Sequence, residues 1–82
     1  MLEELKARAN KVVGVKQSTK AVESGQAEKA FIADEAAPSV TEPFARLCEK
    51  NGVPCEHVDT LKNLGKACGI SVGASVAVLL KV

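Results

Sequence analysis

The sequence predicts an α/β protein with a single domain over residues 1–82, in which helices cover both faces of a four-stranded sheet. Helical and strand-like segments alternate along the chain, a pattern typical of such sheets. Glycine follows three of the four helical segments, where helices commonly end. The 82 residues, 46% of them hydrophobic, are enough for one modest core.

The first half of the chain contains two predicted helices and two predicted strands. Apolar residues at helical spacing predict a helix over residues 2–9, and residues 12–14 form a short strand. A second helix covers residues 16–24 and ends at Gly25. Residues 30–33 follow as a short buried strand.

The third helix is the clearest element because its apolar side chains form one stripe, made of Val40, Phe44, Leu47 and Cys48. Two starting points are open. Ser39 and the glutamate three residues later match a capping box, whereas a Thr41 cap places Pro43 earlier in the first turn, where its missing N–H costs less. Asn51 and Gly52 end the helix.

The remainder of the chain contains a strand, a helix and a final strand. Residues 55–58 are the strand, and Thr60 can cap the helix that follows and ends at Gly69. The apolar face of this helix carries Leu61, Leu64 and Cys68. Residues 75–80 are apolar and rich in β-formers, which predicts the central strand of the sheet.

No segment predicts export or membrane insertion. The longest apolar run, residues 72–80, is about half of the roughly 20 residues that a membrane-spanning helix needs. The N-terminus carries Glu3 and Glu4 and has no apolar signal segment. We therefore expect a cytoplasmic protein that does not contact a membrane.

The sequence carries no recognisable catalytic or metal-binding set. Cys48, Cys55 and Cys68 lack a C-x-x-C spacing, so we interpret them as free, buried thiols and expect no metal site. His57 shares a strand face with Asp59, but no nucleophile elbow or phosphate-binding glycine loop accompanies it, and we interpret it as structural. We expect neither an enzyme nor a cofactor.

Basic and acidic residues are segregated along the chain, although the net charge is only +1. Residues 1–20 carry five basic and two acidic side chains, residues 21–60 three basic and eight acidic, and residues 61–82 three basic and none acidic. Two +3 ends thus flank a −5 middle, which is typical of polarised nucleic-acid binders but also arises by chance among few charges. Phe31 and Phe44 are the only aromatic residues, too few for a base-stacking single-strand binder.

Residues 14–20, with the sequence Gly-Val-Lys-Gln-Ser-Thr-Lys, combine features suited to binding an anion. A strand ends at Gly14 and a helix begins within two residues, so N–H groups at the helix N-terminus are available. Gly14 lets a nucleic-acid backbone approach closely, and Gln17 can read a base edge. Lys16 and Lys20 project on one side. An exposed helix start with ordinary polar residues is the alternative.

Residues 64–74 form a second candidate segment. Lys62 and Lys66 lie on the helix that ends at Gly69, and an apolar loop over residues 70–74 leads into the last strand. An exposed apolar loop usually marks a contact surface. A loop that only seals the core is the alternative.

Together the two segments resemble the L7Ae/L30e ribosomal protein superfamily, which binds kink-turn RNA. Its pattern Gly-x-Asn-Glu-x-x-Lys is similar to residues 14–20, with Lys16 and Gln17 in place of Asn and Glu. Its pattern Leu-Gly-Lys/Arg-Ala-x-Gly-Val/Ile-Ser matches residues 64–71, and Val72-Gly73 replaces the Arg-Pro of many relatives. The similarity extends over almost the whole chain and is strongest to the short bacterial members.

The resemblance implies a three-layer α/β/α sandwich with a mixed four-stranded sheet. It also implies a monomeric, non-enzymatic partner of structured RNA that stabilises the bent form, in or near the ribosome. Carried over to this chain, the tandem sheared G·A pairs of a kink-turn would meet Gly14, Lys16 and Gln17, and Lys20 would support that contact or a nearby phosphate.

The resemblance also assigns the second segment. The nucleotide flipped out of the kink would pack on Val72, Gly73 and Ala74. Further phosphate contacts are expected from Lys11, Lys62 and Lys66. A protein-interaction module on the same fold is the alternative function.

Overall fold

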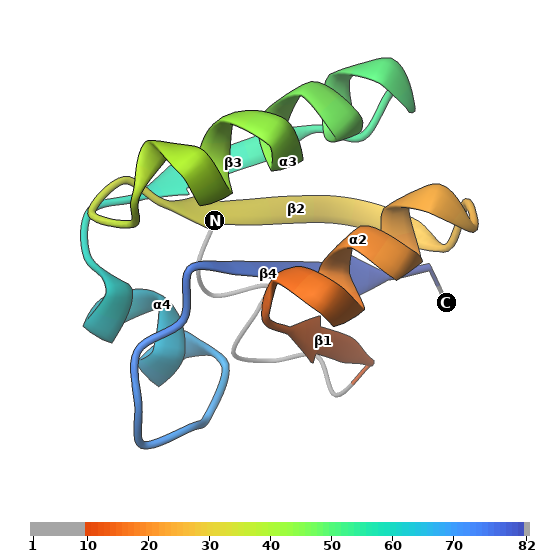
Figure 1. The fold of residues 1–82 in the computed structure, drawn as a ribbon. Coiled ribbons are helices and arrows are strands. Elements are labelled where there is room, and N and C mark those ends of the chain that lie inside the picture. Colours follow the sequence, from red (N-terminus) through yellow and green to blue (C-terminus); the bar gives the residue numbers. More distant parts are fainter. Residues whose placement is uncertain (1–9, 82) are drawn as a thin grey trace.

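The computed structural model describes residues 10–81, in which three helices alternate with four strands (Figure 1). In chain order the elements are β1 (Lys11–Val13), α2 (Val15–Glu23), β2 (Ala27–Ala33), α3 (Pro38–Lys50), β3 (Cys55–Val58), α4 (Leu61–Ala67) and β4 (Val76–Leu80). The helix predicted over residues 2–9 lies outside the described residues. Every other predicted element is present, with ends that differ by a few residues.

The four strands form one mixed sheet in the order β1-β4-β2-β3. β4 runs antiparallel to both β1 and β2, whereas β2 and β3 are parallel. The mixed four-stranded sheet is therefore confirmed, and so is the central position of the last strand. Val76 to Leu79 of β4 are completely buried, as expected for a strand with neighbours on both sides and helices on both faces.

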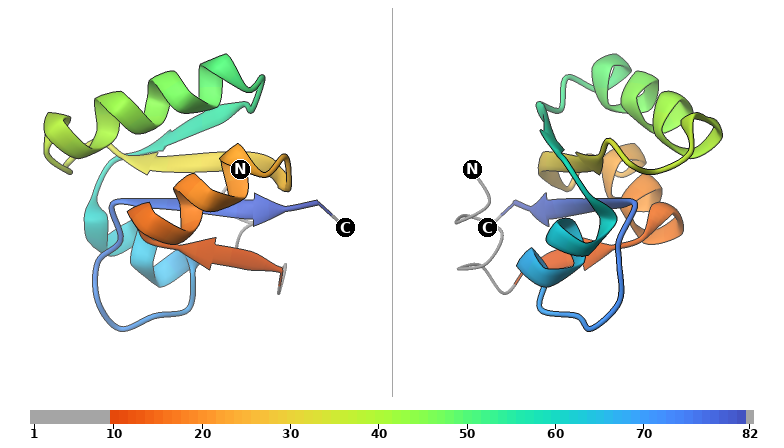
Figure 2. Two further views of the ribbon diagram at one scale, coloured as in Figure 1. Left: turned by 45° about the vertical axis from the view of Figure 1, so that its right-hand side comes forward. Right: turned by 90° about the vertical axis from the view of Figure 1, so that its left-hand side faces the viewer.

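Successive residues of the inner strands point to opposite faces and build two cores. Val76 and Val78 of β4 pack with side chains of α2, β2 and α3, which include Val22, Ile32 and Phe44. Ala77 and Leu79 pack on the other face with side chains that include Phe31 of β2 and Leu64 of α4. Figure 2 shows the result, with α2 and α3 on one face of the sheet and α4 on the other. The predicted three-layer arrangement is confirmed.

The start of α3 differs from both predicted alternatives. The helix begins at Pro38, its N-cap is Ala37, and neither Ser39 nor Thr41 caps it. Proline is favoured at the first helical position because its φ is already helical and its missing N–H has no partner to lose there. Pro43 consequently lies inside the helix, which tolerates it because Phe44 and Cys48 anchor the following turns in the core.

Three strands also have different ends from those predicted, and β1 covers Lys11–Val13 rather than residues 12–14. β2 begins at Ala27 rather than residue 30, because Ala27 and Lys29 pair with Leu80 and Leu79 of β4 around a bulge. β4 begins at Val76 rather than residue 75. Strand ends of this kind are set by the neighbouring strand, which local sequence does not reveal.

The predicted cap of α4 is confirmed. The Thr60 side-chain oxygen accepts a hydrogen bond from the Asn63 N–H at 3.0 Å, the geometry of an N-cap. Within residues 10–81, none of the helices has the length and apolar character required to cross a membrane.

Ser18 supplies a test of this packing. Ser18 lies on the buried face of α2, and its side chain is completely inaccessible to solvent. Among the described residues its hydroxyl has no hydrogen-bond partner. Because a buried unpaired hydroxyl is costly, we expect Ser18→Ala to raise the free energy of unfolding by about 1–2 kcal/mol in urea denaturation. Thr19→Ala, the neighbouring helical control, should gain only about 0.5 kcal/mol from helix propensity. Equal gains in the two variants would contradict this account.

Candidate nucleic-acid interface

The first part of the candidate site is the N-terminus of α2. Gly14 is its N-cap, with φ of 97°, and the position that a Cβ would occupy there is open space. The first helical hydrogen bond runs from the Ser18 N–H to the Gly14 carbonyl at 3.0 Å. The N–H groups of Val15, Lys16 and Gln17 therefore precede the helical ladder and can bind an anion.

The side chains of this helix divide cleanly between core and solvent. Ser18, Ala21 and Val22 are buried, whereas Lys16, Gln17 and Lys20 are exposed. The first turn contains no acidic residue that would oppose an anion. Gln17 and Lys20 face a shallow cleft of about 300 Å³ whose other walls come from Val12, Ala21, Ser24, Gln26 and Leu80.

The second part of the site is the loop between α4 and β4, residues 68–75, which rests directly on α4. The Ile70 N–H donates to the Gly65 carbonyl at 3.1 Å, and the Ala74 N–H donates to the Leu61 carbonyl at 3.0 Å. A Cβ at Gly65 would lie only 2.0 Å from the Val72 carbonyl oxygen. The absence of a side chain at Gly65 thus allows the loop to approach the helix this closely.

The loop exposes apolar side chains but buries one predicted contact residue. Val72 is 68% exposed and Ile70 is 37% exposed. The third large exposed hydrophobic residue in the described chain, Val15 at 39%, is the first residue of α2. Ala74 is only 5% exposed and packs in the core beside α4. The exposed apolar surface of the loop is therefore formed by Ile70 and Val72.

The sheet brings these two segments together. The Gly14 N–H donates to the Val76 carbonyl at 3.0 Å, and Val13 pairs with Ala77 in the β1–β4 register. Because β1 and β4 are antiparallel, the end of β1 lies beside the start of β4. The N-terminus of α2 and the α4–β4 loop consequently occupy the same end of the sheet (Figures 1 and 2).

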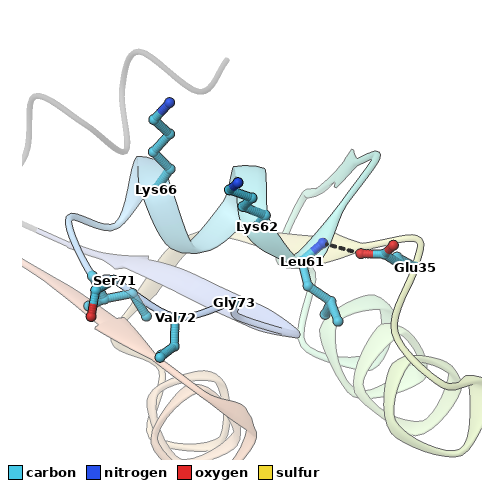
Figure 3. A pocket seen from close by; sticks show the side chains of 8 residues that line it. Glu35, Leu61, Lys62, Lys66, Ser71, Val72 and Gly73 are labelled. Atoms are coloured by element: carbon cyan, nitrogen blue, oxygen red, sulfur yellow. Dashed lines mark hydrogen bonds between the residues drawn. The ribbon is translucent and has the colours of Figure 1, made fainter.

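A larger cleft of about 620 Å³ lies between α4 and the loop (Figure 3). Its lining combines apolar, basic and acidic side chains, from Glu35, Leu61, Lys62, Lys66, Ile70, Ser71, Val72 and Gly73. The two lysines lie one turn apart on α4 and are exposed. The lining thus combines apolar side chains with two lysines, whose side chains point away from Leu61 and Val72 in Figure 3.

Glu35 is the lining residue that the sequence analysis missed. It lies in the turn after β2, and its Oε1 accepts a hydrogen bond from the Leu61 N–H, the first residue of α4, at 2.9 Å. The contact fixes the start of α4 relative to β2. No local signal identifies Glu35, because its partner is far away in the sequence and its own segment is acidic.

The strand order of the sheet also separates the basic ends of the chain from its acidic middle segment. β1 and β4 come from the two basic ends of the chain and are paired, whereas the acidic middle segment supplies β2, α3 and β3. Two basic side chains of the middle segment form salt bridges, Lys29 with Glu56 at 3.0 Å and Arg46 with Glu42 at 3.4 Å. The molecule is therefore basic toward the α2 and α4–β4 segments and acidic toward α3 and β3.

The remaining titratable groups form no comparable site. His57 is exposed, and its Nδ1 lies 2.6 Å from Asp34 Oδ1 rather than pairing with Asp59. Cys48 and Cys68 are buried as predicted, but Cys55 is only half-buried. Within residues 10–81, no three His, Cys, Asp or Glu side chains are grouped in a way that could hold a metal ion.

Comparisons with known proteins give consistent matches. The model of the "Ribosomal protein L7Ae/L30e/S12e/Gadd45 family" matches residues 1–82. An RNA-binding protein of Geobacillus sp. (strain WCH70) is 37% identical over 70 residues, 85% of each chain, and one of Caldanaerobacter subterraneus subsp. tengcongensis is 40% identical over 67 residues, 82% of each chain. The solved structure of a Giardia lamblia 15.5kD RNA binding protein has a TM-score of 0.87 and 29% identity, and the match covers 99% of this chain and 68% of that chain.

The close contact at Gly65 predicts a loop displacement. In Gly65→Ala, the new Cβ would overlap the Val72 carbonyl, so we expect a loss of about 1–3 kcal/mol in stability and amide chemical-shift changes across residues 70–74. Gly69→Ala is the control, because its φ of 80° imposes backbone strain while its Cβ would meet nothing. An unchanged loop spectrum in Gly65→Ala would contradict the packing described.

Proposed function

Because the chain belongs to the ribosomal protein L7Ae/L30e/S12e/Gadd45 family, we propose that it is a non-enzymatic RNA-binding protein that recognises kink-turns, in ribosomal RNA or another structured RNA. The observation that carries the proposal is the hydrogen bond from Gly14 to Val76, which joins the N-terminus of α2 to the α4–β4 loop. The RNA-binding names of the relatives support RNA as the ligand.

The N-terminus of α2 is the part that reads the RNA. Gly14 leaves open space at the helix end, so a backbone or base edge can approach the available N–H groups. Gln17 has both a donor and an acceptor and meets the guanines of the sheared G·A pairs, together with Lys16. Lys20, one turn further along, neutralises a phosphate.

The α4–β4 loop and its cleft receive the nucleotide that is flipped out of the kink. Val72 is strongly exposed and supplies apolar contact to the base, and Gly73, which lines the same cleft, packs closely against Leu61 of α4. Lys62 and Lys66 on the opposite wall bind the flanking phosphates. Lys11, at the start of β1, is a further phosphate contact in this proposal.

Binding shifts the population of the RNA toward its bent form. A sharp bend crowds phosphates, so free RNA adopts it only in part. A protein with affinity for the bent form alone stabilises that form by its whole binding free energy. The segregated charge assists, because the acidic α3 and β3 side is repelled by RNA and the basic side is attracted.

The alternative of a protein-interaction module explains the exposed apolar loop but not its surroundings. A protein-binding loop does not require two lysines in the adjoining cleft or a lysine-bearing helix N-terminus beside it. Together these basic groups favour RNA.

The test is binding of the full chain to a kink-turn duplex and to the same duplex with its G·A pairs replaced. We expect the kink-turn to bind at least about tenfold more tightly, because one good base contact contributes roughly 1–3 kcal/mol of discrimination. Equal affinity for the two duplexes would refute kink-turn recognition. Binding to neither would refute RNA binding of this class.

Gln17 is expected to carry part of that discrimination. Gln17→Ala should lower the ratio of the two affinities by about 5-fold or more while leaving the fold unchanged, because the side chain is exposed. Asn51→Ala is the control, because Asn51 is an exposed amide side chain at the end of α3, away from the cleft that Gln17 faces. The assignment fails if both variants keep the wild-type ratio.

Lys20 is expected to act on affinity rather than selectivity. In Lys20→Ala, loss of one phosphate contact should weaken binding to both duplexes and reduce the slope of log affinity against log salt by about 1. Lys50→Ala, at the end of α3 on the acidic side, should leave the slope unchanged. An unaltered slope in Lys20→Ala would exclude a phosphate contact.

A further inference from the structure

The shallow cleft of about 300 Å³ beside α2 lies on the side of this helix that faces away from α3. One wall is a stripe of α2 side chains at spacings of three or four residues, namely Gln17, Lys20, Ala21 and Ser24. Val12 of β1 and Leu80 of β4 form the opposite wall, and Gln26, beyond the end of α2, completes the lining. The side of the helix toward α3 carries Val15 and Thr19 instead. The cleft therefore extends past the two α2 residues of the proposed function that line it.

The lining of this cleft suits a neutral polar group that also carries apolar surface. Among the described residues that line it, Lys20 is the one basic residue and none is acidic. Val12 and Leu80 are apolar and half-buried, and the other polar groups are two amides and one hydroxyl. A ribose matches this lining, because its C–H groups are apolar and its 2′-hydroxyl both donates and accepts hydrogen bonds. A row of phosphates matches it less well, because phosphates are bound mainly by cations and N–H donors.

Ser24 favours a ligand that donates a hydrogen bond. It is the C-cap residue of α2 and is exposed. Its hydroxyl donates to the Ala21 carbonyl at 3.3 Å, so the proton is already used and the oxygen lone pairs are left to accept. A ribose 2′-hydroxyl can donate to this oxygen, whereas a phosphate oxygen or a deoxyribose cannot.

Backbone hydrogen bonds fix the far end of the cleft. The Gln26 N–H donates to the Ala21 carbonyl at 3.0 Å, and the Lys81 N–H donates to the Gln26 carbonyl at 2.8 Å. The turn after α2 is thereby attached both to the helix and to the segment that follows β4. Ser24 and the exposed Gln26 side chain are consequently presented at defined positions.

The cleft is continuous with the candidate interface. Gln17 and Lys20, to which the proposed function assigns a base edge and a phosphate, are part of its lining. Ser24 follows Gln17 by seven residues, which is about 10 Å along the helix axis. A nucleic-acid strand that meets Gln17 and passes Lys20 can therefore reach Ser24 with its next nucleotides.

We propose that this cleft binds the ribose edge of the RNA strand next to the sheared G·A pairs, and that Ser24 and Gln26 select ribose over deoxyribose. The inference rests on the proposed function, because Gln17 and Lys20 place the strand. The Ser24 oxygen accepts a hydrogen bond from a 2′-hydroxyl, and the Gln26 amide binds a neighbouring sugar. These contacts involve no phosphate, so they add affinity without adding to its salt dependence.

The test measures binding of the full chain to a kink-turn RNA and to a series of the same RNA, each with a single 2′-deoxynucleotide in the stem that carries the G·A pairs. We expect the wild type to lose about threefold to tenfold in affinity at one or two positions, the effect of one hydrogen bond. In Ser24→Ala at least one of these losses should disappear, because the accepting oxygen is absent. Any effect of the substitution on the bending of the RNA is common to both proteins and cancels in the comparison.

The variants separate a ribose contact from a phosphate contact. Ser24→Ala should bind the unmodified kink-turn about threefold to tenfold more weakly, with an unchanged slope of log affinity against log salt. Its fold is preserved, because the Ala21 carbonyl keeps the Gln26 N–H as a partner. Ser24→Thr retains the hydroxyl and should restore the affinity. Ser39→Ala, at an exposed serine of α3 outside the cleft, is the control and should bind like the wild type.

Identical 2′-deoxy profiles for the wild type and Ser24→Ala would overturn the inference and leave kink-turn recognition intact. A smaller salt slope in Ser24→Ala would also overturn it, because Ser24 would then be part of a phosphate contact. If the wild type did not distinguish the kink-turn from the duplex with replaced G·A pairs, the proposed function would be refuted and this inference with it. The two kinds of failure are therefore distinguishable.

Discussion

The antiparallel pairing of β1 with β4 is the constraint on which the candidate site depends. It joins the first and last described strands through the register of Val13 with Ala77 and extends into the hydrogen bond from Gly14 to Val76. The end of β1 lies beside the start of β4, so the N-terminus of α2 and the α4–β4 loop occupy the same end of the sheet. A slip of one residue would exchange the two faces of β4 and disrupt both cores at once.

The loop surface is held by close backbone packing on α4 and by the buried side chains of Cys68 and Ala74. α4 is only seven residues long, yet its Leu61 and Gly65 carbonyls accept hydrogen bonds from both ends of the loop. Glu35 fixes the start of the same helix from the turn after β2. Ile70 and Val72 can therefore remain exposed, because the backbone hydrogen bonds and the buried residues at the two ends of the loop already order it.

Several features followed from local sequence alone. The stripe on α3, the Thr60 cap and the apolar run of β4 each use a rule that acts within a few residues, and the described structure contains all three. The start of α3 and the start of β2 were not predicted. A proline at the first helical position competes with nearby capping residues, and a strand end depends on the partner strand.

The amino-acid sequence by itself determined which residues could take part, namely the glycine and lysines of residues 14–20, the apolar loop and the segregation of charge. Only the tertiary structure decided which of them meet. It paired β1 with β4, buried Ala74 and brought Glu35 from the acidic middle to the start of α4. These outcomes depend on contacts between residues distant in the chain, and such contacts have no local periodicity from which they could be predicted.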